Sequence, residues 1–455
     1  MTRVIKLCVF LLFLPLTPLS AQWSTLTTST LYPTWYDATP CATKTLPSPI
    51  DDVIHFACPP AGYGSQTAGA RFTDQIIANP HVVVNDAGEW LIIGYGENTF
   101  TDTDFTATTS DDIADAIYVF KRKTDGSYVV PTQPALQFPT GSQPLGYLGA
   151  GLGLAKTTTA TTNGYRYFAI VPVFEPATNH GWLAWAVSTN GETWSFVSSS
   201  GGLTSDARAS FKVIARSDLR NDGAIAIQHV AMVYDPRDGH LYLAIGYAGQ
   251  FAGIKTTWWR IHFNAQTPYG LTAVTRADGT PGYAVDLLNS GTFQPSAGVI
   301  PADYFEAWVA AAQWPSSSAG YGPADPMDVI RLTNSDGSFN SMMFVYVSET
   351  AFPHDYRYVK ASLPTTTNGM FVTDPGFSTP KALDFSSLLN QGYSDCGAGG
   401  GFYTGFIQGP NDAWGQPQQL FGYVGTWHAD RSYPRSSPDC GGQWQGLLPM
   451  KFIVQ

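Results

Sequence analysis

The stretch Val230-Ala-Met-Val-Tyr-Asp-Pro-Arg-Asp-Gly-His-Leu-Tyr-Leu-Ala-Ile245 consists of two apolar segments separated by a polar turn. Asp-Pro and Asp-Gly are typical of tight turns, because proline presets φ and glycine accepts positive φ at little cost. The flanking segments are rich in β-branched and aromatic residues, which favour strands. The sequence therefore predicts a β-hairpin over residues 230–245.

The same arrangement of strand, glycine turn and aromatic strand recurs along the chain. Its turns lie at residues 88, 164, 239, 337 and about 417, so consecutive turns are separated by 76, 75, 98 and about 80 residues. A third strand is predicted after four of these hairpins, at 116–121, 181–187, 257–263 and 356–361. A repeat of this length matches a four-stranded blade with long loops. We therefore expect an all-β protein, a β-propeller of five blades, or of six if residues 304–314 belong to another blade.

The N-terminus has the pattern of a secretory signal peptide. Arg3 and Lys6 precede an apolar run over residues 7–14, and Ser20-Ala21 offers a cleavage point. The run is too short to cross a bilayer, which takes about 20 residues. We therefore expect residues 1–21 to be removed and the protein to be secreted, to the extracellular space or the periplasm.

The remaining chain is expected to form one propeller domain over residues 71–455, with residues 22–70 as an irregular lead-in or a ring-closing strand. No later segment has the length of a transmembrane helix, so no membrane contact is expected after cleavage. Loss of the two basic residues of the signal segment changes the formal net charge from −11 to −13. Such an acidic protein repels nucleic acid and anionic lipid, so neither is an expected partner.

Four cysteines remain after the signal segment is removed. An even number in an exported chain favours disulfides. Four cysteines allow three pairings, and the pairing Cys41–Cys58 with Cys396–Cys440 closes the shortest loops. Their spacing contains no CxxC or CxxH cluster, which disfavours a zinc site.

One turn resembles the Asp-box turn of sialidase-like propellers. In Trp185-Ala-Val-Ser-Thr-Asn-Gly-Glu-Thr-Trp194, the residues Gly191, Thr193 and Trp194 agree with that motif, whereas Thr189 stands at the position of its aspartate. The Asp box is a folding element in those families, so the resemblance implies a propeller and no particular activity.

A second resemblance covers about three of the repeats. The segments Asn79-Pro80-His-Val-Val-Val-Asn-Asp-Ala-Gly88 and Gln228-His-Val-Ala-Met-Val-Tyr234 resemble blade openings of the arabinanase-like and fructosidase-like glycoside hydrolases, which are five-bladed propellers. In that family an acid or base would stand at the positions of Asn79 and Gln228, and an aspartate would open the second blade, where this chain has Gly149-Ala-Gly-Leu-Gly153. An amide has no proton to exchange at neutral pH, so the catalytic trio of the family does not carry over.

Other acidic residues recur at one position of the repeat. The start of an inner strand and the end of the second strand lie on the same face of a propeller. Glycoside hydrolysis needs two carboxyl groups, about 5 Å apart for retention and roughly 6.5 to 9.5 Å apart for inversion. The candidates at these strand ends are Asp74, Glu97, Glu175, Glu349 and Asp430. For each of them alone, a solvated turn residue is the alternative interpretation.

Side chains near the same strand ends are candidates for contacts with a sugar. Aromatic rings suit the C–H faces of sugar rings, and a few polar groups orient the hydroxyls. The candidate substrate-binding residues are Asn79, Tyr95, Gln228, His229, Trp427 and His428.

No cofactor or metal is predicted, with calcium as the one alternative. The segment after the first hairpin carries five aspartates, Asp102, Asp104, Asp111, Asp112 and Asp115. Their oxygens suit calcium, but the segment lacks the ligand order and the central glycine of an EF-hand. A solvated acidic loop is therefore the preferred interpretation.

Three functional hypotheses follow for an oligosaccharide or polysaccharide ligand. The first is a glycoside hydrolase that draws its carboxylate pair from the five acids, one of them protonated. The second is a propeller that binds glycans without catalysis, which the amides at Asn79 and Gln228 favour. The third is a polysaccharide lyase, for which His428, Arg431 and Tyr433 are compatible residues. No GxSxG motif supports a serine hydrolase.

Overall fold

Antiparallel strands make up nearly all of the secondary structure in the computed structural model, which describes part of the chain. The described residues are 26–30, 77–97, 115–129, 131, 134–137, 147–148, 151–175, 180–215, 225–249, 253–275, 281–289, 292–295, 324–348, 355–362, 372–373, 381–382, 404–415, 417, 419–429 and 443–454. Within them, one 3₁₀ turn at Ala207–Ala209 is the only helical element. The predicted all-β class is therefore confirmed.

Five sheets of four or more strands are present in the described part of the chain. The first contains β2 (Ile77–Val84), β3 (Trp90–Glu97), β4 (Asp115–Arg122), β5 (Tyr128–Val129) and β6 (Leu136–Gln137). The second contains β7 (Tyr147–Leu148), β8 (Gly153–Lys156), β9 (Tyr167–Glu175), β10 (His180–Ser188), β11 (Ser195–Val197), β12 (Leu203–Thr204) and β13 (Lys212–Ala215).

The other three sheets come from the second half of the chain and one N-terminal strand. The third contains β14 (Ile225–Asp235), β15 (His240–Gly249), β16 (Gly253–Ile261), β19 (Val285–Asn289) and β20 (Thr292–Pro295), with β17 (Ala273–Thr275) and β18 (Pro281–Tyr283) as a separate pair. The fourth contains β21 (Ala324–Thr333), β22 (Phe339–Ser348), β23 (Asp355–Ser362), β24 (Val372–Thr373) and β25 (Lys381–Ala382). The fifth contains β26 (Thr404–Gln408), β27 (Gln419–Ala429), β28 (Gln443–Val454) and β1 (Leu26–Thr30).

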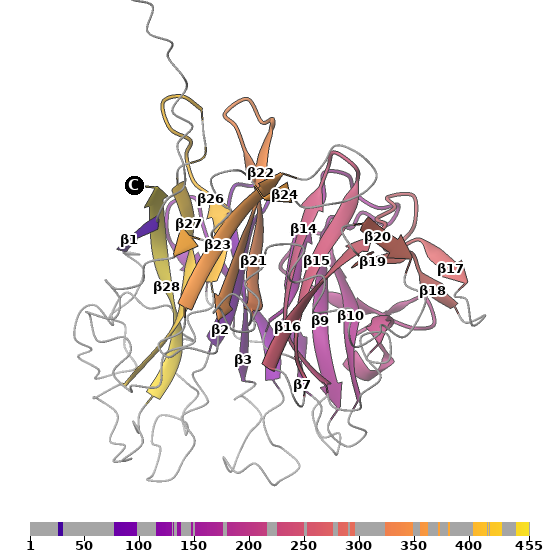
Figure 1. Ribbon diagram of the computed structural model, residues 1–455. Coiled ribbons are helices and arrows are strands. Elements are labelled where there is room, and N and C mark those ends of the chain that lie inside the picture. The colour runs from indigo at the N-terminus through magenta and orange to yellow at the C-terminus, as the bar shows by residue number, and fades with distance from the viewer. Residues whose placement is uncertain are drawn as a thin grey trace, which may run out of the picture.

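Each sheet places one strand at a common axis. These inner strands are β2, β8, β14, β21 and β26, and each contacts the inner strands of the two sheets beside it. The predicted hairpins join the inner strands to the second strands, and Gly88, Gly164, Gly239 and Gly337 have positive φ in their turns. Sheets side by side around an axis are a propeller arrangement, as predicted (Figure 1).

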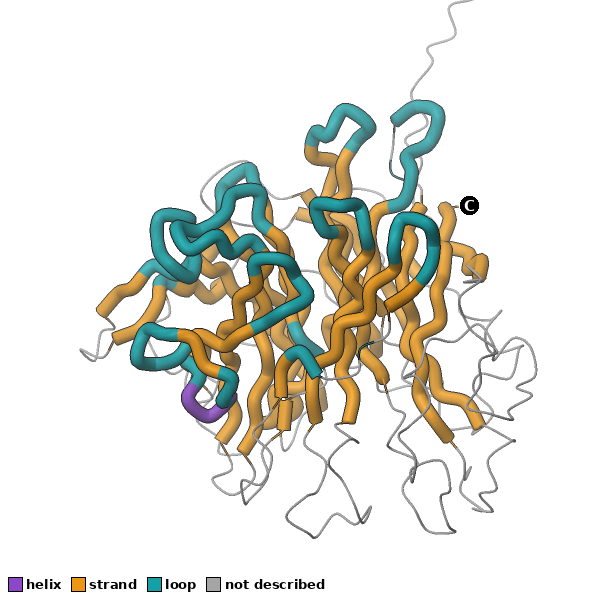
Figure 2. Tube along the Cα trace, turned by 180° about the vertical axis from the view of Figure 1, so that it is seen from behind, coloured by secondary structure: helices purple, strands orange, loops and turns teal. Residues whose placement is uncertain are grey.

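The two ends of the axis differ. The hairpin turns that follow the inner strands gather at one end, which we call the turn face (Figure 2). The inner strands begin at the opposite end, which we call the start face, and the second strands end there. This follows from the antiparallel register, in which Ile77 pairs with Gly96 and Ile225 pairs with Gly249.

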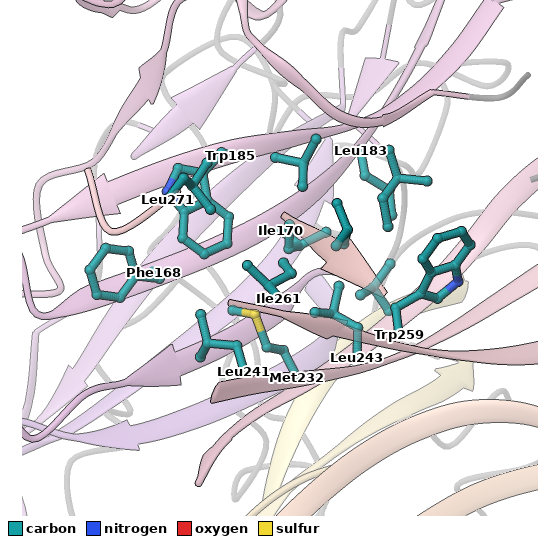
Figure 3. Close-up of a cluster of buried hydrophobic side chains, with 14 of the residues drawn as sticks. Phe168, Ile170, Leu183, Trp185, Met232, Leu241, Leu243, Trp259, Ile261 and Leu271 are labelled. Atoms are coloured by element: carbon teal, nitrogen blue, oxygen red, sulfur yellow. The ribbon is translucent and has the colours of Figure 1, made fainter. Parts of the chain in front are cut away.

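The second sheet packs against a neighbouring sheet on each of its two faces. On β9, Phe168 and Ile170 lie in the cluster shared with the third sheet, whereas Ala169 and Val171 lie in the cluster shared with the first. Figure 3 shows Phe168 and Ile170 facing Met232 from the third sheet. Because both faces of the sheet are buried, its strands are apolar at almost every position.

Aromatic stacking joins the first and the last sheet. The ring of Trp90 on β3 stacks on Phe421 of β27 at 5.8 Å and meets Tyr423 edge-on at 6.3 Å. The N-terminal strand β1 pairs with β28 at the outer edge of the fifth sheet, from Leu26 opposite Val454 to Thr30 opposite Met450. The two ends of the described chain therefore meet in one sheet.

The turn that resembles an Asp box is closed by different residues than the motif predicts. The Asn190 side-chain oxygen accepts hydrogen bonds from the backbone N–H groups of Glu192 and Thr193, both at 2.9 Å. The indole of Trp194 donates to the Gly191 carbonyl at 2.7 Å. The Ser188 Oγ accepts from the Gly191 N–H at 2.8 Å. Asn190 and Ser188, and not Thr189, therefore supply the side-chain acceptors of this turn.

Replacement of Gly405 by alanine should destabilise the protein by about 1–3 kcal/mol, the usual cost of overpacking. A Cβ at this position of β26 would lie 2.3 Å from the Pro80 carbonyl oxygen and 2.7 Å from the His81 Cα, so backbone would have to move. Urea unfolding measures the effect. Gly202→Ala is the matched control, because its Cβ would have only an ordinary contact at 3.7 Å. Equal stability of the two variants would contradict the close approach of β26 to β2.

Candidate functional site

Two of the predicted carboxylates end second strands at the start face. Glu97 is the last residue of β3 and pairs with Asp115, and Glu175 is the last residue of β9 and pairs with His180. The first and second sheets share a hydrophobic core, so these strand ends belong to neighbouring sheets. In the first sheet the end of β3 lies beside the start of β2, where Ile77 pairs with Gly96. A pocket shared by Glu97 and Glu175 stays a prediction.

Three inner strands are interrupted by bulges a few residues from their start. The register shifts between Ala78 and His81 on β2, between Ile227 and His229 on β14, and between Pro326 and Asp328 on β21. A bulge leaves residues outside the ladder and re-aims their side chains. Two of the bulges contain the amides that the sequence singles out, Asn79 and Gln228. Asn79 also has a φ of 48°, a left-handed conformation that costs little for asparagine.

The bulges and their neighbours close the axis, and we call this region the axial plug. It consists of Asn79, Pro80, His81, Gly151, His229, Val230, Pro326, Met327 and Thr404. The space between these residues is too small for a water molecule. A Cβ on Gly151 would lie 2.5 Å from the His229 ring, and the Val230 N–H donates to the Gly151 carbonyl at 3.0 Å. The inner strands therefore approach one another closely at this level.

Polar groups in the axial plug are deeply buried. Asn79 and His229 are only 5% and 6% exposed. The Oδ1 of Asn79 and the Oγ1 of Thr404 have no hydrogen-bond partner among the described residues. Burial lowers the pKa of His81 to about 3, with a further contribution from His229. His81 is therefore neutral at physiological pH.

On the other side of the plug, a cavity of about 300 Å³ opens toward the turn face. We call it the axial cavity. All five inner strands contribute to its wall, and its polar and charged lining residues are His81, Lys156, Thr158, Tyr234, Asp328, Arg331 and Gln408. The plug separates this cavity from the start face, where the predicted carboxylates end their strands.

Asp328 is a buried carboxyl group in the wall of the axial cavity. It accepts hydrogen bonds from the Phe406 N–H at 2.7 Å and the Val329 N–H at 2.8 Å. Burial raises its pKa to about 8, although both hydrogen bonds favour the ionised form. The carboxyl group therefore satisfies an N–H of the neighbouring inner strand and is largely protonated at neutral pH.

The sequence reasoning missed Asp328 and the axial cavity. The signal was present, because Asp328 lies in Met327-Asp-Val-Ile330, an otherwise apolar run of an inner strand. A charged residue in such a run needs a buried partner, which the edge of β26 supplies. Lys156, Arg331 and Gln408 gave no comparable signal, because each lies at or near the end of a strand, where polar residues are common.

The remaining predicted residues divide by position. The backbones of Tyr95, Gln228, Trp427 and His428 lie in β3, β14 and β27, so they are strand residues. Several predicted residues lie outside the described residues, and their roles stay predictions: Asp74, Glu349, Asp430, Arg431, Tyr433, Cys41, Cys58, Cys396 and Cys440. Of the aspartates considered for calcium, only Asp115 is described, as the first residue of β4. Among the described side chains, no group of three potential metal ligands is found, and none of the described helical structure is long enough to span a membrane.

No protein-family model matches the sequence, and no curated protein is similar to it in sequence. Solved structures are similar at low identity. An N-acetylgalactosamine deacetylase from F. plautii, solved with blood group B trisaccharide, is 9% identical with a TM-score of 0.46, over 85% of this chain and 92% of that one. A family 117 glycoside hydrolase from Zobellia galactanivorans is 9% identical with a TM-score of 0.44, over 86% and 90%. A β-fructofuranosidase from Schwanniomyces occidentalis is 10% identical with a TM-score of 0.43, over 87% and 57%. At these identities and TM-scores, no activity of these proteins can be assigned to this chain.

Asp328 and His81 should shape the pH dependence of stability. Asp328 keeps its proton up to about pH 8 when folded and loses it near 3.8 when unfolded, so its contribution to stability falls as the pH rises through that range. His81 gains a proton near 6.5 when unfolded and only at about 3 when folded, so its contribution falls as the pH drops through that range. Between pH 3.8 and 6.5 the two groups change the free energy of unfolding in opposite directions as the pH rises. From pH 6.5 to 8 only the Asp328 contribution changes, so the two together predict a decline in stability.

Urea unfolding of the wild type and Asp328→Asn at about pH 5, 6.5 and 8 measures these slopes. The wild type should lose at most about 1.4 kcal/mol per pH unit above 6.5 through this one group. Asparagine does not titrate, so the variant, although less stable throughout, should lack that loss and should gain stability from about pH 5 to 6.5. An equal decline above 6.5 in both proteins would show that Asp328 is already ionised there.

Proposed function

We propose that the protein is a secreted carbohydrate-active protein, a glycoside hydrolase whose carboxylate pair lies at the start face. The observation that carries the proposal is the position of Glu97 and Glu175, which are the last residues of the second strands in two neighbouring sheets. In a glycoside hydrolase, two acids at equivalent points of adjacent repeats would face one pocket at the axis. The axial plug would form the polar floor of that pocket.

The chemistry requires one protonated carboxyl group and one carboxylate on opposite sides of the glycosidic bond. The first gives a proton to the leaving oxygen, and the second attacks the anomeric carbon or activates a water molecule. The partners are drawn from Asp74, Glu97, Glu175, Glu349 and Asp430. Burial or a like charge nearby would keep the acid protonated at neutral pH.

We propose further that the five sheets are the blades of one five-bladed ring. The cyclic order of contacts among β2, β8, β14, β21 and β26 supports this count, as does the contact of Trp90 with the fifth sheet. In such a ring the strand ends of all five sheets surround one mouth. An oligosaccharide or polysaccharide entering that mouth would reach the carboxylates of several sheets at once.

A propeller that binds glycans without hydrolysis is the second candidate. The amides Asn79 and Gln228 favour it, because both lie in bulges of inner strands at the start face. Amides donate and accept hydrogen bonds to sugar hydroxyls without exchanging a proton. In this case the mouth would recognise a sugar and release it unchanged.

Replacement of a catalytic carboxylate by its amide should lower hydrolysis by about 10²–10⁴-fold, the usual contribution of general acid–base catalysis. The experiment tests Glu97→Gln, Glu175→Gln and the amide variants of Asp74, Glu349 and Asp430 on a panel of neutral and acidic polysaccharides. Released reducing ends are the measurement. Asp125→Asn is the matched control, because Asp125 is an exposed turn residue at the turn face.

Full activity of all five variants on a hydrolysed glycan would overturn the assignment of the pocket. If no glycan is hydrolysed, a glycan array decides between the two candidates. Binding without product would establish the non-catalytic propeller. The absence of both binding and product would overturn the carbohydrate function itself.

A further inference from the structure

The axial cavity is separate from the proposed catalytic mouth. It lies on the turn-face side of the axial plug, and its volume is about 300 Å³. The plug leaves no room for a water molecule between its residues. A molecule bound at the start face therefore cannot reach the axial cavity along the axis, and any ligand of this cavity enters from the turn face.

Two basic side chains line the cavity. Lys156 lies at the end of β8 and Arg331 near the end of β21, so they approach from different sheets. The acidic lining residue Asp328 is held largely protonated by burial at neutral pH and offsets little of this charge. The whole chain has a formal net charge of −11. A cavity with a basic lining is therefore a local exception to the charge of this protein.

The guanidinium of Arg331 lacks an acceptor within the described part of the chain. Its Nε is buried and has no hydrogen-bond partner there. The neighbouring carboxylate of Asp235 is held by Arg237, with 2.7 Å between Arg237 Nη2 and Asp235 Oδ2. Burial lowers the pKa of Arg331, yet arginine stays charged in proteins, so its guanidinium group brings a positive charge to the cavity wall.

Lys156 is tied to the rim of the cavity. Its Nζ lies 2.7 Å from the Asp86 carboxylate and donates to the Val84 carbonyl at 2.9 Å. The ammonium group also lies 5.5 Å from the centroid of the Tyr167 ring, so these contacts fix it in place at the rim. The hydroxyl groups of Tyr234 and Thr158 lie 3.5 Å apart beside it and supply further donors.

The remaining wall of the cavity is apolar. It includes Val83, Leu154, Met232, Val233, Ile330 and Ile407. The cavity, at about 300 Å³, is much larger than one water molecule, which occupies about 30 Å³ of liquid. A bare inorganic anion would therefore leave the apolar wall and most of the cavity volume unfilled. A ligand with an apolar body and one anionic end would cover the wall and reach the basic groups at once.

From these contacts we infer that the axial cavity binds a small organic carboxylate with an apolar body. The carboxylate accepts hydrogen bonds from Arg331 and Lys156, and the body of the ligand packs against the apolar wall. Arginine suits this role because its planar fork matches the two oxygens of a carboxylate. Binding in this cavity does not require hydrolytic activity, so the inference can be tested independently of the proposed catalysis.

Isothermal titration with hexanoate tests the inference, with hexan-1-ol as the neutral counterpart and sulfate as the inorganic anion. The wild type should bind hexanoate, and both hexan-1-ol and sulfate should bind at least about tenfold more weakly. Arg331→Met should weaken hexanoate binding by about 10–100-fold, the loss of a charge-assisted hydrogen bond, and Arg331→Lys should restore part of it. Arg208→Gln, at an exposed arginine outside the cavity, is the matched control.

Glu97→Gln and Glu175→Gln separate this cavity from the start face. Their affinity for hexanoate should equal that of the wild type, whatever their hydrolytic activity. If Arg331→Met does not fold, Lys156→Met reports on the same cavity and should weaken binding by about tenfold. Absence of hexanoate binding, equal binding of hexan-1-ol, tight binding of sulfate, or unchanged binding in the Arg331 and Lys156 variants would each overturn the inference.

Discussion

Burial of both faces of each sheet is the constraint on which the rest of this structure depends. A sheet that packs between two others cannot alternate between apolar and polar residues, because neither face meets water. The strand β9 satisfies the constraint with Phe168 and Ile170 on one side and Ala169 and Val171 on the other. The rings of Trp258 and Phe344, 4.8 Å apart and edge-on, extend the same packing from the third sheet to the fourth. Where a charged group is buried on an outer strand it is paired, as Asp286 is with Arg260 and His262.

At the axis the constraint concerns backbone hydrogen bonds, because each inner strand pairs with a neighbour in its sheet on one edge only. Asp328 satisfies part of the unpaired edge by accepting the N–H of Phe406 from the next inner strand. The glycines at 151 and 405 let neighbouring strands approach within the space that a Cβ would fill. These contacts close the axis at one level only. The start face and the turn face are therefore chemically separate, and each has its own polar surroundings.

The hairpins and the repeat could be predicted from the sequence because their signals are local. Residues 230–245 form β14, a turn and β15, and the glycine at 239 has the positive φ that the turn requires. The short outer strands, such as β12 and β17, were missed because pieces of two or three residues carry no periodic pattern. The position of Glu97 at a strand end was predictable for the same local reason as the turns.

The arrangement around the axis could not be predicted, because bulges break the alternation on which strand reasoning relies. The sequence places Asn79 at the start of an inner strand, yet its φ of 48° and its burial in the plug follow from the approach of β26. Asp328 and Arg331 lie on the same strand, and only the contact with other sheets makes them lining residues of one cavity. Contacts between distant repeats leave no trace in the local pattern of one sequence.

The pairing of β1 with β28 has a consequence for how the protein folds. Leu26 lies opposite Val454, so this ladder joins residues 428 positions apart in the sequence. The conformational entropy of a very large loop is lost before such a contact stabilises the fold. The fifth sheet is therefore expected to gain its edge strand β1 late in folding. Until then the free edge of β28 is open to pairing with other chains.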